Sequence, residues 1–310
     1  MDLSYSQSAV ARSCWMKYKF KYVDGLRPID TKPSLTLGKA VHDAFDLFYN
    51  GKDNQTIVQY INTIFKDKIS TVGPQDVEAL ELAKYTALGM WLYYPHKTLS
   101  FQDIKPEVEF KLPADYHIII DNTTIINDIN FVGRVDGLVK KNNKYWLREL
   151  KTTGLSMRQF EGRMHTSYQA TGYIWAMQKV TGHKIQGVMY DVIKKPLLRK
   201  RVSEMADDFG RRIMEDYSDE KKQKHYFQRL YTYRTEDDVK RYEEDRMHLV
   251  GDICRRKKSN MWYRNPESCW QFNSECPYKK ICFCDKPDQL IVDLMFTKKE
   301  DNEKSSSSKS

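Results

Sequence analysis

Two acidic residues and a lysine lie in the middle of the chain in an order that suits metal-assisted hydrolysis. Asp136 comes first, and Glu149 and Lys151 follow with one residue between them. Carboxylate oxygens are the ligands that Mg²⁺ and Mn²⁺ prefer. A lysine beside such a metal can orient a water and stabilise negative charge on phosphorus, so these residue types predict metal-dependent phosphodiester hydrolysis. Considered alone, Glu149 and Lys151 are explained more simply by a surface ion pair.

A β-hairpin would bring these residues together. Residues 130–140 and 144–151 read as strands, and the Asn142-Asn143 pair between them tolerates the positive φ of a tight turn. With that two-residue loop, Asp136 faces Glu149 across the strands, with Cβ atoms roughly 4.5–5.5 Å apart. Facing carboxylates repel each other, and a divalent cation between them removes the repulsion.

The same register assigns the remaining side chains to faces of the hairpin. Lys141 pairs with Lys144, and Lys151 shares the face of Glu149 because strand side chains alternate. The opposite face is expected to pack on a helix, and it comprises Val135, Val139, Trp146 and Leu150.

The elements around the hairpin predict an α/β protein. Helices are expected at 36–50, 76–95, 166–181 and 236–257, and further strands at 105–111, 117–121, 185–193 and 225–232. This order indicates a mixed sheet flanked by helices. We find no repeats and no internal linker, so we expect one domain over residues 1–296 and a disordered, serine-rich tail over 297–310.

The composition of the chain is compatible with a nucleic-acid partner. Lys plus Arg exceed Asp plus Glu by 51 − 42 = 9, and the chain holds 20 tyrosines and 6 tryptophans. A polyanion-binding surface and a merely basic soluble enzyme fit this balance equally well. No apolar stretch approaches the ~20 residues of a membrane span, and no secretory signal is present, so a cytoplasmic location in a bacterial or phage-infected cell is expected.

The spacing of these motifs resembles the PD-(D/E)xK nuclease superfamily. Gly133-x-x-Asp136 followed by Glu149-Leu150-Lys151 is similar to its RecB-like branch, which includes AddB-like iron–sulfur exonucleases, CRISPR-adaptation nucleases and phage exonucleases. The resemblance covers about residues 4–285 and implies a restriction-endonuclease-like core. The literal Pro-Asp is absent, because Val135 precedes Asp136.

Two further motifs of that branch stand in the right order. ‘GKAVH’, Gly38 to His42, resembles an element whose histidine adds a nitrogen ligand to the metal, and ‘QATGY’ resembles a Gln169-x-x-x-Tyr173 motif. Read singly, the histidine is more simply structural, and Gln169 and Tyr173 are an exposed residue and a core aromatic. The implied catalytic residues are Asp136, Glu149, Lys151, Gln169 and Tyr173, and the implied Mg²⁺ or Mn²⁺ ligands are His42, Glu109 (preferred weakly to Glu107), Asp136, Glu149 and the Leu150 carbonyl.

The cysteines indicate a second centre. Cys14 is isolated near the start, whereas Cys254, Cys269, Cys276, Cys282 and Cys284 come late. Four thiolates can bind zinc or an iron–sulfur cluster, and free buried cysteines are the simpler alternative. The resemblance implies a 4Fe–4S cluster on Cys14, Cys269, Cys276 and Cys282, with Cys284 in reserve and Cys254 a bystander. Such a cluster would tie the two ends of the chain together.

The expected function is a metal-dependent DNA exonuclease in recombination, repair or processing of DNA ends. Basic residues at 194–201 and 255–258 would contact phosphates, and Tyr5, Trp15 and Tyr168 would stack on bases or simply pack. The sequence has no phosphate-binding motor loop, so a helicase or recombination protein would supply unwinding. The alternatives are a CRISPR-adaptation-like end-trimming nuclease and a non-catalytic, zinc-containing nucleic-acid-binding module.

Overall fold

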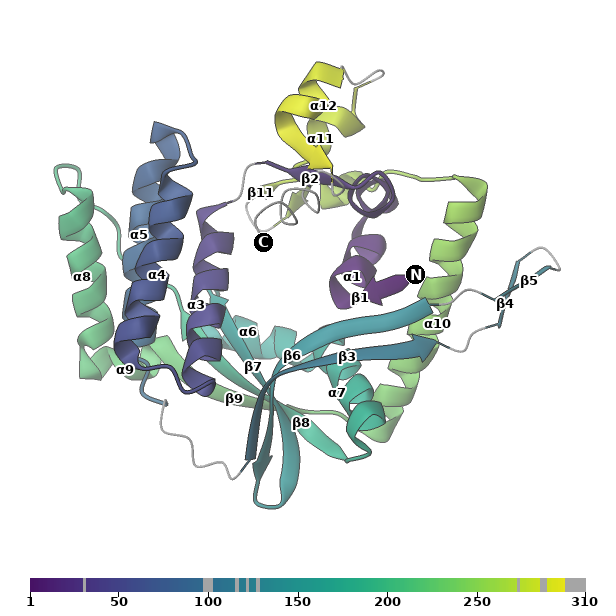
Figure 1. The fold of residues 1–310 in the computed structure, drawn as a ribbon, viewed down its shortest axis with the longest axis horizontal. Coiled ribbons are helices and arrows are strands. Elements are labelled where there is room, and N and C mark those ends of the chain that lie inside the picture. The colour runs from purple at the N-terminus through teal and green to yellow at the C-terminus, as the bar shows by residue number, and fades with distance from the viewer. Residues whose placement is uncertain are drawn as a thin grey trace, which may run out of the picture. The chain divides into compact units, whose positions relative to one another are not determined.

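The computed structural model describes residues 1–29, 32–96, 103–114, 117–120, 123–126, 129–271, 274–284 and 289–298. The chain divides into two compact units, each built from separate segments (Figure 1). Unit 1 comprises residues 1–31, 111–133 and 240–310, and unit 2 comprises residues 32–110 and 134–239. The single domain expected over residues 1–296 stays a prediction.

Unit 2 contains most of the regular structure. Its helices are α3 (Pro33–Tyr49), α4 (Asn54–Ile69), α5 (Pro74–Leu92), α6 (Met157–His165), α7 (Tyr168–Thr181), α8 (Ala206–Ser218) and α9 (Glu220–Tyr226). Its strands are β7 (Lys144–Thr153), β8 (Ile185–Lys194), β9 (Phe227–Tyr233) and the parts of β3 (Asp103–Ala114) and β6 (Ile129–Lys141) that belong to this unit.

The strands of unit 2 form a mixed sheet, as the sequence predicted. β6 and β7 pair antiparallel, β7 and β8 parallel, and β8 and β9 antiparallel. The turn between β6 and β7 has φ of 50° at Asn142 and 58° at Asn143, which confirms the tight turn. The predicted register is confirmed as well, because Lys141 pairs with Lys144.

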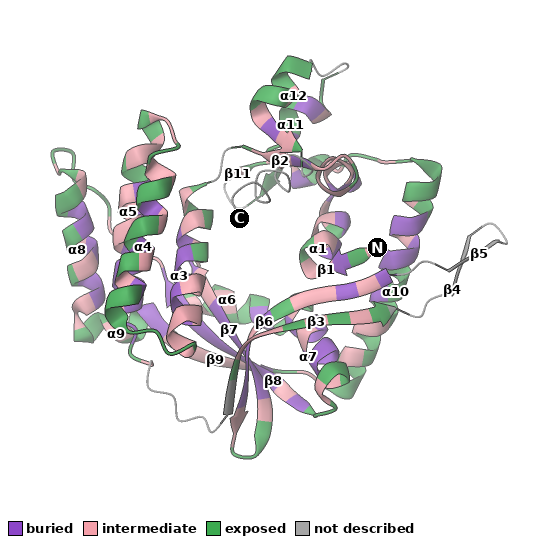
Figure 2. Ribbon diagram, viewed as in Figure 1, coloured by how far each residue is buried: buried purple, intermediate pink, exposed green. Residues whose placement is uncertain are grey.

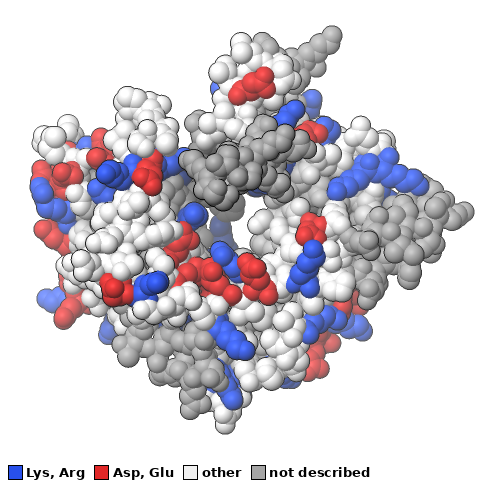
Figure 3. All heavy atoms as spheres, viewed as in Figure 1, with Lys and Arg blue, Asp and Glu red and all other residues white. Residues whose placement is uncertain are grey.

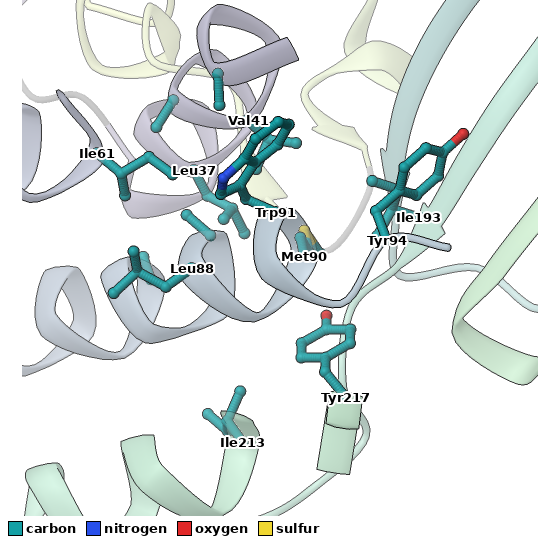
Figure 4. Close-up of a cluster of buried hydrophobic side chains, with 14 of the residues drawn as sticks. Leu37, Val41, Ile61, Leu88, Met90, Trp91, Tyr94, Ile193, Ile213 and Tyr217 are labelled. Carbon is teal, nitrogen blue, oxygen red and sulfur yellow. The ribbon is translucent and has the colours of Figure 1, made fainter. Parts of the chain in front are cut away.

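A layer of helices covers one face of this sheet. Helices α3, α4, α5 and α8 pack against one another and stand side by side in Figure 1. Their apolar side chains converge with Leu150 of β7 and Ile193 of β8 on a buried cluster that includes Val41, Trp91 and Tyr217 (Figure 4). The strands β7 and β8 are coloured largely as buried in Figure 2, because helices cover both of their faces.

The other face of the sheet packs on α7, and here one expectation was wrong. Val135 does not share a cluster with Val139, Trp146 or Leu150. It packs instead with Leu138 and the side chains of α7, because the regular ladder between β6 and β7 ends at the pair Gly137–Arg148. The strict alternation of faces does not extend past that pair.

Unit 1 is built from the two ends of the chain and a central segment. Its elements are β1 (Asp2–Ser4), α1 (Tyr5–Ser13), α2 (Trp15–Tyr18), the π-helix η1 (Lys19–Val23), β2 (Leu26–Pro28), β4 (His117–Ile120), β5 (Thr123–Ile126), most of α10 (Glu236–Ser259), the 3₁₀ turn η2 (Pro266–Ser268), β10 (Trp270–Gln271), β11 (Ser274–Glu275), α11 (Lys279–Cys282), α12 (Gln289–Met295) and β12 (Phe296–Lys298). Within it β1 runs parallel to the start of β6, and β12 pairs with β2. The expected disordered tail lies outside the described residues except for 297 and 298, which belong to β12. Among the described helices, none combines the length and the apolar character needed to span a membrane.

Candidate active site

Asp136, Glu149 and Lys151 lie within unit 2, where the ladder between β6 and β7 ends. The last pair, Gly137–Arg148, directly precedes the predicted pairing of Asp136 with Glu149. Beyond it, Oδ2 of Asp136 accepts a hydrogen bond of 2.8 Å from the backbone N–H of Leu150. The side chain of Asp136 is therefore fixed against β7 beside Glu149.

Buried Glu149 and half-buried Lys151 form an ion pair. The ammonium Nζ of Lys151 donates to Oε1 of Glu149 at 2.5 Å, and Glu149 is 4% exposed. Burial raises the pKa of Glu149 to about 7, because the attraction of Lys151 offsets only part of the desolvation and Asp136 adds repulsion. Burial alone would lower the pKa of Lys151, but Glu149 and Asp136 together raise it. Lys151 therefore carries its positive charge at neutral pH.

His42 approaches Asp136 from helix α3. Its Nδ1 lies 3.4 Å from Oδ2 of Asp136. Burial lowers the pKa of His42, and the opposing attraction of Asp136 does not reverse this shift. A neutral imidazole can offer a nitrogen lone pair to a metal ion. Helix α3 also comes close to β7 at Gly38, where a Cβ would lie 3.8 Å from the Thr152 hydroxyl.

Gln169 and Tyr173 lie one turn apart on α7, as their spacing predicted. Nε2 of Gln169 donates to the hydroxyl of Tyr173 at 3.1 Å. Burial raises the pKa of Tyr173, and the charge of Glu149 raises it further. The electrostatic influence of Glu149 shows that this end of α7 lies near the ion pair.

Two further acids belong to this site: Asp46, which the sequence analysis missed, and Glu107, which it named as the less favoured alternative to Glu109. Asp46 lies one helical turn after His42. Its pKa is raised to about 8 by burial and by hydrogen bonding to and repulsion from Glu107, with repulsion from Asp136 adding to this. Glu107 also forms an ion pair of 2.9 Å with Arg134. The preferred candidate Glu109 is exposed, so the structure places Glu107 rather than Glu109 beside the other acids.

Arg148 is a buried residue that contacts the backbone of Asp136. It is 1% exposed, its Nη2 donates to the carbonyl oxygen of Asp136 at 2.6 Å, and its guanidinium lies 3.7 Å from the ring centre of Tyr49. Among the described residues, its Nε and Nη1 have no hydrogen-bond partner. A Cβ at Gly137 would lie 3.1 Å from Nε, so the glycine makes room for this arginine.

The donor set of the site suits a divalent cation, but the side chains do not converge on one point. Within the described ranges, no three His, Cys, Asp or Glu side chains are grouped closely enough to hold a metal ion. His42 and Asp136 form a pair, whereas the nearer oxygen of Glu149 is held by Lys151. Burial is the main cause of the raised pKa values of Asp46 and Glu149, and repulsion from Asp136 adds to both; a bound cation would offset this repulsion.

Some residues expected to contact DNA are engaged elsewhere. Lys194 is 5% exposed and its Nζ lies 2.8 Å from Nε2 of His225, so it does not reach the surface. Trp15 is buried beneath the guanidinium of Arg256, which makes it a packing residue. On the face shown in Figure 3, acidic and basic side chains are interspersed rather than separated into a single basic surface.

The cysteines chosen for a cluster all lie in unit 1. Burial raises the pKa values of Cys276 and Cys282, and the thiols of Cys14 and Cys269 raise both further. The backbone N–H of Cys276 donates to the carbonyl of Cys269 at 2.8 Å. The four thiols thus influence one another, although no three of them are grouped in ligating geometry in the part of the chain that the structure describes. Cys284 is exposed and Cys254 is buried.

The fold is that of an α/β protein with a mixed sheet, whose central hairpin carries an aspartate, a glutamate and a lysine and is approached by a histidine from the covering helix. The family model of the PD-(D/E)XK nuclease superfamily matches residues 2–283. The chain belongs to this superfamily, whose members are usually metal-dependent hydrolases.

Comparisons with individual proteins add little to this assignment. No curated protein matches the chain. One solved structure, titled "Crystal structure of SSO0001", is 14% identical to it, covers 60% of this chain and 74% of its own, and has a TM-score of 0.20. A TM-score this low is not evidence of a shared fold.

Proposed function

We propose that the protein is a metal-dependent DNA exonuclease. The observation that carries this proposal is the partly buried ion pair of Glu149 and Lys151, next to an Asp136 carboxylate that is fixed by the Leu150 N–H and approached by His42. A structural ion pair alone would not need two further acids, Asp46 and Glu107, in the same place.

The residues of the site have separate roles in the proposed reaction. His42, Asp136, Glu149 and the Leu150 carbonyl would hold Mg²⁺ or Mn²⁺, which supplies Lewis-acid stabilisation of the phosphate when bound. Lys151 is charged, so it does not act as a base. It orients a water against phosphorus and stabilises the negative charge that develops as the bond to the leaving oxygen breaks. Gln169 and Tyr173 support this end of the site or contact the substrate.

A 4Fe–4S cluster on Cys14, Cys269, Cys276 and Cys282 is part of the proposal. It is supported by the mutual influence of these four thiols and would tie the N-terminal helices to the segment around α11. Iron and acid-labile sulfide, measured after anaerobic purification, should be lost in Cys276→Ser and retained in Cys284→Ser. Zinc in place of iron would contradict the cluster and favour the zinc-containing alternative.

The activity is tested by digesting end-labelled single- and double-stranded DNA with Mg²⁺ or Mn²⁺. The wild type should shorten DNA from an end, Glu149→Gln and Lys151→Ala should not, and Asp67→Asn, an exposed carboxylate change on α4, should behave as the wild type. Equal cleavage by all four proteins would place the activity elsewhere. Internal cuts without shortening would refute the exonuclease assignment, and short trimmed overhangs would favour the end-trimming alternative.

The cellular role proposed is recombination, repair or processing of DNA ends. A helicase or recombination protein is the expected partner, because a nuclease site without a motor cannot open a duplex by itself. Co-purification of tagged Glu149→Gln protein from its native cell identifies such a partner.

A further inference from the structure

A pocket of about 540 Å³ lies in unit 2 outside the candidate active site. It is formed by β3, the turn end of the β6–β7 hairpin and the last turn of α7. Val108 and Leu138 supply apolar surface, and Lys105, Lys140, Tyr145 and His183 supply charge and aromatic rings. The volume falls within the range of small-molecule sites, about 300–1,000 Å³.

The aromatic and basic groups of this pocket are already ordered. The rings of Tyr145 and His183 are stacked, with centroids 4.1 Å apart and an interplanar angle of 5°. Nζ of Lys140 lies 5.6 Å from the centre of the Tyr145 ring. The ion pairs between described side chains include neither Lys105 nor Lys140, and both of these lysines line the pocket.

This combination selects one kind of ligand. A stacked aromatic pair offers a flat surface to a planar base, and two ammonium groups attract a phosphate. We propose that the pocket binds a nucleotide, with the base against Tyr145 and His183 and the phosphate between Lys105 and Lys140. The choice of a nucleotide rests on the proposed function, because a nuclease meets both DNA strands and the mononucleotides it releases.

The pocket is separate from the site of cleavage but lies on the same hairpin. Lys140 is four residues from Asp136 on β6, and Tyr145 is four residues from Glu149 on β7, which is about 13 Å at the rise of a strand. That distance corresponds to about four nucleotides of a duplex strand at 3.4 Å each. A nucleotide in the pocket therefore comes either from the strand that is being cleaved or from free mononucleotide.

The test measures binding without cleavage. Full-length wild type, the double variant Lys105→Ala/Lys140→Ala and the control Lys144→Ala are titrated in EDTA with deoxyadenosine 5′-monophosphate by calorimetry and with labelled single-stranded DNA by anisotropy. Lys144 is an exposed lysine at the start of β7 and does not line the pocket. Each pocket lysine should contribute about tenfold to affinity. Because both pocket lysines are half-buried or exposed, their loss should leave folding intact.

The outcomes separate the two sources. Mononucleotide binding that weakens about 100-fold in the double variant, but not in Lys144→Ala, supports a free nucleotide. A weaker affinity for DNA alone, with no binding of mononucleotide, supports a base of the strand. No difference between the double variant and Lys144→Ala with either ligand overturns the proposal. If the wild type binds mononucleotide in this pocket but cleaves no DNA, the proposed function fails while the pocket stands.

Discussion

Replacing Glu149 with glutamine should stabilise the metal-free protein while abolishing cleavage. Burial raises the pKa of Glu149 from 4.5 to about 7, so the fold disfavours its ionised form. A group with a raised pKa gives its full stabilisation below the unfolded value of 4.5, and loses it as pH rises through about 7. At 1.36 kcal/mol for each pKa unit, ionisation costs about 3 kcal/mol at pH 8 but only about 1 kcal/mol at pH 5. Glutamine avoids this cost because it stays neutral.

Urea denaturation in EDTA at pH 5 and pH 8 measures this difference. At pH 8 the Glu149→Gln variant should be more stable by about 3 kcal/mol, or about 6–12 °C in Tm for a unit of this size. The gain should fall to about 1 kcal/mol at pH 5, and Asp67→Asn should show no such pH dependence. If Glu149→Gln is less stable than the wild type at pH 8, the ion pair with Lys151 is a net stabilising contact. The conclusion that burial makes the ionised form of Glu149 unfavourable is then refuted.

Three further predictions test the surroundings of the site. Gly187→Ala should destabilise by about 1–3 kcal/mol in urea denaturation, because its Cβ would lie 2.1 Å from a backbone carbonyl oxygen of β9, whereas Gly154→Ala, with no atom within 4 Å, should be neutral. Arg148→Met should raise the Mn²⁺ concentration for half-maximal cleavage by about 10–100-fold, because it removes the bond to the Asp136 carbonyl, and an unchanged metal titration would show that this bond is dispensable. The pKa of Asp46 is about 8, so metal affinity should fall as pH drops below that value. In calorimetric titrations, Asp46→Asn should make the metal affinity less dependent on pH. If the metal affinity of this variant changes with pH as steeply as that of the wild type, protonation of Asp46 is not coupled to metal binding.

Local signals were enough to predict the hairpin and several helices. Two asparagines with positive φ fix a two-residue turn, and a two-residue turn fixes every pair of the ladder as far as Gly137–Arg148. Helix α4 was not predicted, although it carries an ordinary signal. Ile57, Ile61 and Phe65 repeat every four residues and are fully buried, and Asp53 caps the first turn through the N–H of Thr56.

The division into two units could not be predicted in the same way. Three of the four boundaries fall inside β3, β6 and α10, near residues 110, 133 and 239, and the fourth lies between residues 31 and 32. A domain boundary shows in a sequence when it coincides with a linker. Here three regular elements run through it, so composition gives no sign of it.

The choice between Glu107 and Glu109 shows where spacing stops being informative. Val108 and Phe110 pack toward the core, so alternation alone would place both glutamates on the opposite face of the strand. Alternation therefore gives no reason to prefer one of them as a metal ligand. Glu107, however, has a φ of 44°, a left-handed conformation that changes the course of β3 at that residue and that residues other than glycine rarely adopt. The departure brings Glu107 to Asp46 and Arg134 and leaves Glu109 exposed. The hairpin register placed Glu149, and the resemblance of its motif indicated His42, whereas a ligand candidate that depends on a local break in the strand must be found in the three-dimensional structure.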